Sequence, residues 1–281
     1  YATETESIRD LAVLDRYIKR IGIGRFENRS AAPRQVLVKD FQTALSAALA
    51  RNCSKVELVE SHAPDAPAFL VDPPLLDNGQ ADTYAISQAA RGSGFQVIVR
   101  GQLVSLRHRV ERSGWGSFRE SHNFLDLRLM AVAFDALTGI IIAQNSELIS
   151  LPIDANTGAA VDAGADVDLP ELSEAVNETG VDMALKLCTS IRSHHWQTVV
   201  LEIQGTEMIL AAHPAAGLKV GNRLAVFDGS RIMTGSDGER FVLTEFRQGT
   251  VSVSKVTDEA VRAVSEGGET FPVGSILVPV R

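Results

Sequence analysis

The sequence predicts an α+β fold, an α/β-like mixed sheet with flanking helices, followed by a small all-β barrel of the SH3-like type. Two observations lead to this class. Up to residue 197, apolar residues are spaced as in strands (every second residue) or as in helices. These spacings predict the order strand, helix, strand, helix, three strands, helix. Beyond it, short apolar runs alternate with Gly and Asp turns. We therefore divide the chain into an N-terminal segment (1–16), an α/β domain (17–197) and a small β-barrel domain (198–281).

The first part of the α/β domain is predicted as strand, helix, strand, helix. Residues 18–26 alternate as a strand, and residues 36–51 carry an apolar stripe at helical spacing. Residues 56–59 form a short strand, followed by a Pro-rich loop. Asp82 is predicted to cap a helix that runs to Arg91 and ends at Gly92.

The second part of this domain is predicted as a three-stranded meander and a long helix. The strands cover residues 95–109, 123–135 and 140–148, and leucines recur in strict period two along the middle one. Residues 154–168 are predicted to be a low-complexity Gly/Ala/Asp loop. Residues 171–193 form an amphipathic helix, in which Gly180 is a weak point.

The barrel domain is predicted from six short strands at residues 199–203, 208–212, 223–227, 241–246, 251–256 and 275–280. Between the last two, residues 258–264 have a helical spacing of apolar side chains. The domain is therefore expected to be almost entirely β, with one short helix.

Composition excludes several classes of protein. The 281 residues carry a formal net charge of -8, and this acidic balance disfavours a dedicated nucleic-acid binder. No apolar run reaches the ~20 residues of a membrane helix, so no transmembrane segment is predicted. Two cysteines are too few for a structural zinc site or a disulfide scaffold. The prediction is a water-soluble globular protein.

Catalytic and cofactor motifs are lacking in the sequence. There is no P-loop, dinucleotide fingerprint or nucleophile elbow, so we predict no enzyme activity and no cofactor. His194 and His195 are predicted to be solvated at a helix end. Asp154-x-Asn156-x-Gly158 resembles the opening of a calcium loop, but Ala165 stands where the bidentate Glu belongs, and no metal site is predicted.

The two cysteines allow two structures. Cys53 follows the first long helix, and Cys188 lies on the apolar stripe of the last one. They could be two buried thiols that pack as small hydrophobic side chains. They could instead form one disulfide between the two helices, if the protein is exported and their Cα atoms lie within about 7 Å.

Charge is segregated into two segments. The Leu151–Leu185 tract has eight acidic residues and no Lys or Arg, whereas Arg100–Arg119 has five arginines around one acid. We predict that the second segment is a hairpin and hypothesise that it binds an acidic surface, such as this tract in a neighbouring subunit. The candidate interaction residues are Arg107, Arg109, Arg112, Trp115, Phe118 and Arg119. The alternative is a hairpin whose Trp115 folds back onto its own sheet.

Three stretches carry a resemblance to known bacterial envelope proteins. They are residues 20–26 (RIGIGRF), residues 124–144 with the turn DALTG, and residues 217–226 (GLKVGNRLAV). The first two resemble the TolB amino-terminal domain, the periplasmic domain of the curli-secretion lipoprotein and the middle domain of the flagellar assembly protein T family. The third resembles the small β domain that follows in the flagellar family.

The resemblance implies a non-enzymatic periplasmic assembly protein, associated with the flagellar basal body or the outer membrane. Its partners would be envelope proteins, including further copies of this chain in a ring. The alternative is an accessory subunit of an outer-membrane secretion or transport complex of the curli-secretion type. Because the chain begins at Tyr1, we expect either removal of a signal peptide or trimming of the chain.

Overall fold

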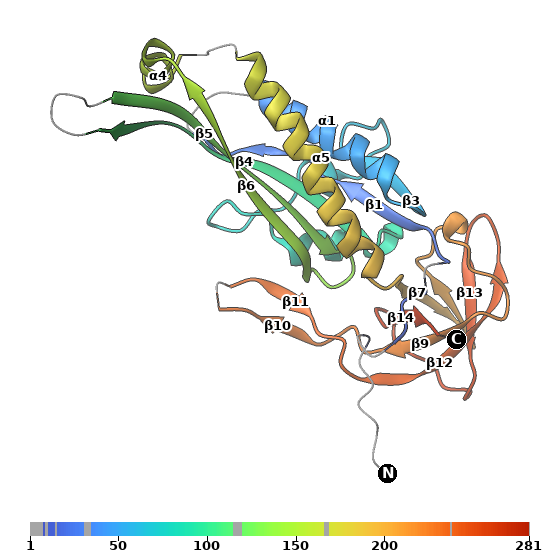
Figure 1. Ribbon diagram of the computed structural model, residues 1–281. Coiled ribbons are helices and arrows are strands. Elements are labelled where there is room, and N and C mark those ends of the chain that lie inside the picture. Colours follow the sequence, from blue (N-terminus) through green and yellow to red (C-terminus); the bar gives the residue numbers. More distant parts are fainter. Residues whose placement is uncertain are drawn as a thin grey trace.

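The computed structural model describes residues 8, 11–14, 16–30, 35–114, 120–165, 169–236 and 238–280. A six-stranded mixed sheet with helices on both faces is followed by a closed antiparallel barrel (Figure 1). The predicted architecture of sheet, flanking helices and barrel is confirmed. The elements of the sheet domain are β1 (Lys19–Ile23), β2 (Glu27–Asn28), α1 (Gln35–Asn52), β3 (Val56–Glu60), α2 (Ala68–Val71), α3 (Thr83–Ala90), β4 (Val97–Ser113), β5 (Glu120–Asp135), β6 (Ile141–Ile153), α4 (Ala155–Asp162) and α5 (Pro170–Ser193).

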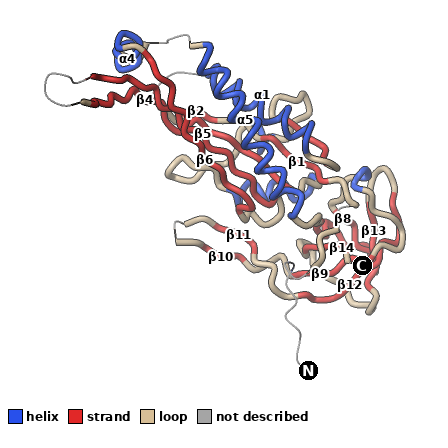
Figure 2. Tube along the Cα trace, viewed as in Figure 1, coloured by secondary structure: helices blue, strands red, loops and turns tan. Residues whose placement is uncertain are grey.

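The sheet has the order β3-β1-β4-β5-β6, and β2 pairs with β4. The first two pairings are parallel, and β4–β5 and β5–β6 are the antiparallel hairpins of the predicted meander. The leucines at period two on β5 are fully buried beneath α1 and α5, which lie side by side on one face of the sheet (Figure 2). Helices α2 and α3 cover part of the opposite face through a second apolar cluster around Phe134.

Close contact between α1 and α5 explains the glycine inside the long helix. A Cβ atom at Gly180 would lie 3.0 Å from the Cβ of Ala44 and 3.4 Å from the backbone nitrogen of Leu45. The position is therefore a point of close helix approach rather than a weakness in the packing. The C-terminus of α5 is capped by the buried Lys19, whose Nζ donates to the carbonyls of Ile191 and Arg192.

Gly180→Leu is expected to lower the free energy of unfolding by about 1–3 kcal/mol, because overpacking forces the two helices apart. Asn177→Leu is the matched control, since it adds the same side chain to an exposed position of α5. Urea denaturation of both variants measures the difference. Equal stability of the two variants would contradict the close-contact role of Gly180.

The barrel contains β7 (Thr198–Gln204), β8 (Glu207–Leu210), β9 (Arg223–Phe227), β12 (Arg247–Val256), β13 (Val261–Ser265) and β14 (Ile276–Pro279), closed in the order β12-β13-β8-β7-β14-β9. An arm of two short strands, β10 (Ile232–Thr234) and β11 (Arg240–Val242), reaches back to the sheet domain. There the Arg240 guanidinium lies over the Tyr84 ring of α3, 4.6 Å from its centroid. The arm therefore joins the two parts of the molecule.

Three predicted features outside residues 151–185 differ in the structure. The helix predicted at residues 258–264 is wrong, because the segment leads into the strand β13. Val261 and Ala263 of this strand point into the barrel core, and pairing with β8 and β12 decides its conformation. The strand predicted at residues 241–246 is limited to β11. Gly94, not Gly92, takes the left-handed conformation, with φ of 69°, because a 3₁₀ turn continues the chain beyond α3.

The segment before β1 also packs on the barrel. Tyr17 is buried in the barrel cluster, and its ring centroid lies 5.4 Å from that of Trp196. Ile8 and Leu11 join a second cluster that contains barrel residues together with Leu137 from the β5–β6 turn. The two domains of our division therefore share apolar contacts. No helix among the described residues is long and apolar enough to cross a membrane.

Candidate functional site

The predicted Arg-rich hairpin, residues 100–119, begins inside the sheet, and its outer part extends beyond α1 and α5 (Figure 1). Its strands stay paired out to Ser113 and Glu120. Residues 110–113 and 120–122, which we call the distal ribbon, are all exposed, and Val110 is 47% exposed. The distal ribbon is thus a two-stranded element without an apolar core of its own among the described residues.

The candidate interaction residues have different surroundings. Arg107 and Arg112 are exposed. Arg109 is held within the hairpin: its Nε donates to Asp126 Oδ2 at 2.6 Å, a guanidinium nitrogen pairs with Glu111, and its Cζ lies 4.7 Å from the centroid of the Phe124 ring. The same bond to Arg109 holds the pKa of Asp126 below its usual value. Trp115, Phe118 and Arg119 lie outside the described residues.

The acidic tract, residues 151–185, contacts the hairpin within the same chain, whereas the contact between subunits that we hypothesise stays a prediction. After the last residues of β6 the tract forms the helix α4, so the loop predicted over residues 154–168 is wrong where α4 stands. His108 Nδ1 lies 2.8 Å from Asp162 Oδ2, and its Nε2 lies 3.0 Å from Asn123 Oδ1. These bonds raise the pKa of His108. A Cβ at Gly158 would lie 2.4 Å from this ring, which explains the glycine there.

The calcium-like pattern has a structural explanation. The Asp154 carboxylate is the N-cap of α4, and it accepts from the backbone nitrogens of Asn156 and Thr157 at 2.8 and 3.0 Å. Asp and Asn near a helix start resemble the opening of a calcium loop because both motifs use a carboxylate to bind local partners. Across the described ranges, no three His, Cys, Asp or Glu side chains are grouped to hold a metal ion.

The two cysteines are joined. Cys53 and Cys188 form a disulfide with a Cα–Cα distance of 5.5 Å and a sequence separation of 135 residues. This is the second of the two structures allowed by the sequence. The bond ties the residue after α1 to the buried face of α5, so it links the two helices that cover the sheet.

A buried carboxylate joins the sheet to the start of the barrel. Asp135 Oδ1 accepts from the backbone nitrogens of Leu137 and Thr138, both at 2.7 Å. Asp135 Oδ2 lies 2.8 Å from His194 Nε2 and accepts from Gln197 Nε2 at 2.9 Å. Burial opposes ionisation of Asp135, but these bonds outweigh it and lower its pKa.

The prediction of two solvated histidines at the end of α5 is therefore wrong. His194 is mostly buried against Asp135. His195 Nε2 bonds the carbonyl of Leu11 at 2.9 Å, and burial lowers the pKa of His195. The partner of His194, Asp135, belongs to the sheet, and the partner of His195, Leu11, belongs to the N-terminal segment. The sequence of the helix alone therefore could not show that the two histidines are bonded.

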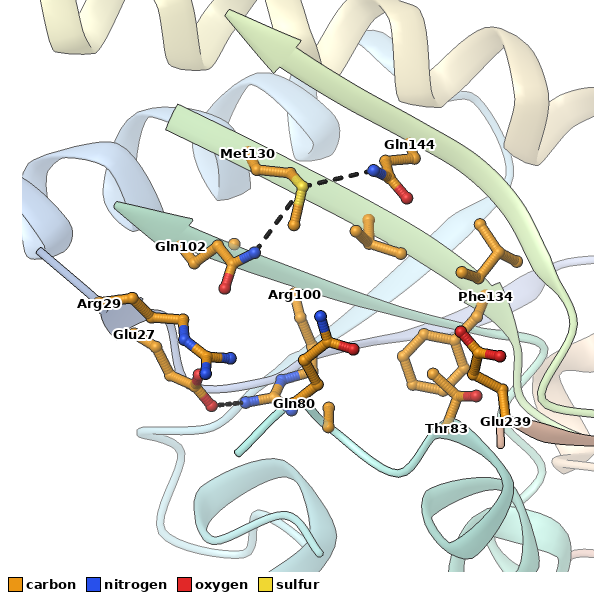
Figure 3. Close-up of a pocket in the computed structure, with 14 residues that line it drawn as sticks. Glu27, Arg29, Gln80, Thr83, Arg100, Gln102, Met130, Phe134, Gln144 and Glu239 are labelled. Carbon is orange, nitrogen blue, oxygen red and sulfur yellow. Dashed lines mark hydrogen bonds and ion pairs between the residues drawn. The ribbon is translucent and has the colours of Figure 1, made fainter. Parts of the chain in front are cut away.

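The open part of the second sheet face contains a pocket of about 240 Å³ (Figure 3). Its floor comes from β4, β5 and β6, one wall from the segment before α3, and the far end from Glu239 beside β11. Arg100 lies at its base and pairs with Glu27. Gln102 and Gln144 donate to the Met130 sulfur at 3.7 and 3.4 Å.

Sequence reasoning missed Asp135, Gln197 and the residues of this pocket. The turn DALTG was a usable signal, because an Asp followed by a tight turn often accepts from the next backbone nitrogens. No signal marked Arg100 as different from the other arginines of its strand. It lies against Glu27 of β2 and the backbone at Gly24, which come from another part of the chain.

The fold and these sites define the chain as an α+β protein with a helix-covered mixed sheet and a barrel. Comparison with protein-family models and with curated proteins finds no match. A solved structure of a hypothetical protein from Chlamydia trachomatis is similar, with 11% identity over 61% of this chain and 98% of that one and a TM-score of 0.36.

Two further solved structures are similar at the same level. A lipoprotein from Neisseria meningitidis has 12% identity over 59% of this chain and 98% of its own, with a TM-score of 0.34. A PelC dodecamer from Paraburkholderia phytofirmans has 9% identity over 62% of this chain and 92% of its own, with a TM-score of 0.33. Similarity at these values assigns neither a family nor a function.

Proposed function

We propose that this chain is an extracytoplasmic assembly protein of the bacterial envelope that binds other proteins and catalyses no reaction. The observation that carries the proposal is the distal ribbon. A two-stranded hairpin is marginally stable in water without a further packing surface. Here the strands continue for several residues beyond the last buried side chain and keep Val110, Arg107 and Arg112 exposed. A protein partner would supply the missing cover.

The disulfide supports the compartment. Structural disulfides persist in the periplasm and outside the cell, whereas cytosolic thiols are kept reduced. The link between Cys53 and Cys188 is therefore expected of an exported protein. The acidic net charge fits protein partners rather than nucleic acid.

The finer form of the proposal is an association with the flagellar basal body or the outer membrane, including a ring of several copies. It rests on the resemblance of the three stretches 20–26, 124–144 and 217–226 to the TolB-like and small SH3-like domains described above. The alternative function is an accessory subunit of a secretion or transport complex of the curli-secretion type. The two differ in the partner that the hairpin contacts.

A photo-crosslinking amino acid at position 110 is expected to capture a protein partner in cells of the source organism, because Val110 lies on the distal ribbon. Mass spectrometry of the adduct identifies a second copy, a basal-body protein or a secretion subunit. Position 201 is the matched control, since Leu201 is a strand residue on the barrel that is 39% exposed. Equal crosslinking at both positions, or none at 110, would contradict the proposal.

A further inference from the structure

The pocket of Figure 3 is independent of the distal ribbon and has its own chemistry. Its volume of about 240 Å³ is below the ~300 Å³ at which drug-sized sites begin, so it fits a small molecule or one terminal group of a larger one. It lies on the sheet face opposite to α1 and α5, where α2 and α3 leave part of the strands uncovered.

A buried arginine lies at the base of the pocket. Arg100 is only 9% exposed, and one of its terminal nitrogens pairs with Glu27. Its Nε is enclosed by protein and has no partner within the described part of the chain, so a group in the pocket can meet this guanidinium only through its terminal nitrogens. An anionic oxygen is the acceptor that a guanidinium binds best.

A second arginine gives this end of the pocket an excess of positive charge. The Arg29 guanidinium is fixed by the carbonyls of Gly79 and Asn78 at 3.1 and 3.2 Å, which are uncharged partners. Burial is the main cause that lowers the pKa of Arg100, and the charge of Arg29 adds to it while Glu27 opposes it. The single negative charge of Glu27 therefore neutralises only one of the two positive charges, those of Arg29 and Arg100.

The rest of the pocket is largely apolar. Met130, Val132 and Phe134 from β5 line its floor, and Ile141 from β6, which is 50% exposed, lines its rim. Figure 3 places Glu239 beside Phe134, away from Arg29. An anionic group is thus favoured at the Arg29 end and repelled at the Glu239 end. This difference would orient a bound molecule with its anionic group towards Arg29.

We propose that this pocket binds a small amphipathic carboxylate, whose carboxylate contacts the guanidinium groups of Arg100 and Arg29 while its apolar body covers Met130, Val132 and Ile141. Such a carboxylate can be a free branched acid or the C-terminal residue of a peptide. The recognition chemistry at the two arginines is the same for both.

Isothermal titration with three probes tests the proposal. The probes are 4-methylpentanoate, N-acetyl-leucine and the neutral N-acetyl-leucinamide. Both acids are expected to bind, and the amide at least about tenfold more weakly, because it lacks the charge that pairs with the arginines. Tighter binding of N-acetyl-leucine identifies a peptide terminus, and tighter binding of 4-methylpentanoate a free acid. Equal binding of acid and amide would overturn the proposal. So would the absence of binding by either acid at about 10 mM, a concentration at which even a weak specific complex forms.

Two variants locate the binding site. Ile141→Glu is expected to weaken binding of the acids at least about tenfold, because it removes apolar contact and adds a like charge. Leu148→Glu is the matched control on the same strand, at 53% exposure and outside the pocket. Arg29→Gln, an exposed change, is also expected to weaken binding, so the test stands even if variants of Arg100 fail to fold. Unchanged affinity in both Ile141→Glu and Arg29→Gln would exclude this pocket.

Discussion

Replacing Cys53 and Cys188 together by alanine is expected to lower the free energy of unfolding by about 3–5 kcal/mol, because the disulfide restricts the unfolded chain. The link closes a separation of 135 residues, and its two ends belong to the layer formed by α1 and α5. Without it the unfolded chain gains conformational freedom, while the folded state keeps its other contacts.

Denaturation with and without a reducing agent measures this effect and contains its own control. The reducing agent is expected to destabilise the wild-type chain and to leave the double alanine variant unchanged. If the wild-type chain has the same urea midpoint in both conditions, the disulfide makes no contribution to its stability. The compartment argument for an exported protein would then lose its main support.

Asp135→Ala is expected to lower the free energy of unfolding by about 3–5 kcal/mol, because it removes one buried acceptor from four donors. Two of these donors, the Leu137 and Thr138 backbone nitrogens, shape the β5–β6 turn. The other two, His194 and Gln197, begin the connection to the barrel. Loss of the carboxylate thus weakens the turn and the junction together, which urea denaturation of the variant measures.

Asp126→Ala is the matched control for this variant. Asp126 lies on the same strand, but its pair with Arg109 is partly exposed, and such pairs contribute at most about 1 kcal/mol. A loss at position 135 no larger than the loss at position 126 would contradict the role assigned to Asp135.

The pH dependence of the Asp135 contribution follows from its lowered pKa. The folded-state pKa lies below the unfolded value of about 3.9, so the charged form stabilises the folded chain at pH values above the unfolded pKa. This contribution is lost as the pH falls through the folded-state pKa. The stability difference between wild type and Asp135→Asn is therefore expected to be largest near neutral pH and to shrink towards pH 2.

The spacing of apolar residues and the residue types at turns were sufficient to predict most of the fold. The leucines of β5 and the apolar stripes of α1 and α5 were predicted in place, because each buries one face of a regular element. The segment 258–264 was assigned wrongly because its few apolar residues fit both periods, and pairing with β8 and β12 decided between them. Gly180 was recognised as unusual, but the helix that it contacts could not be known.

The sites were harder to predict than the fold. The Arg-rich hairpin could be found from its composition, but the sequence did not distinguish exposed Arg107 and Arg112 from Arg109, which is bound by Asp126 across the hairpin. Burial of Asp135 and Arg100 depends on residues more than fifty positions away, such as Gln197 and Glu27. Such long-range juxtapositions are set by topology, which local patterns do not encode.

Shortening the hairpin tests the central proposal, binding of envelope proteins through the distal ribbon, most directly. Arg109 pairs with Phe124, so residues 110–123 can be replaced by an Asn-Gly turn that closes the two strands at this register. We expect the shortened chain to fold, as judged by circular dichroism and urea denaturation, and to lose its complex on native gels of the envelope fraction. If the shortened chain instead forms a complex of the same size as the wild-type chain, the distal ribbon is not the binding surface.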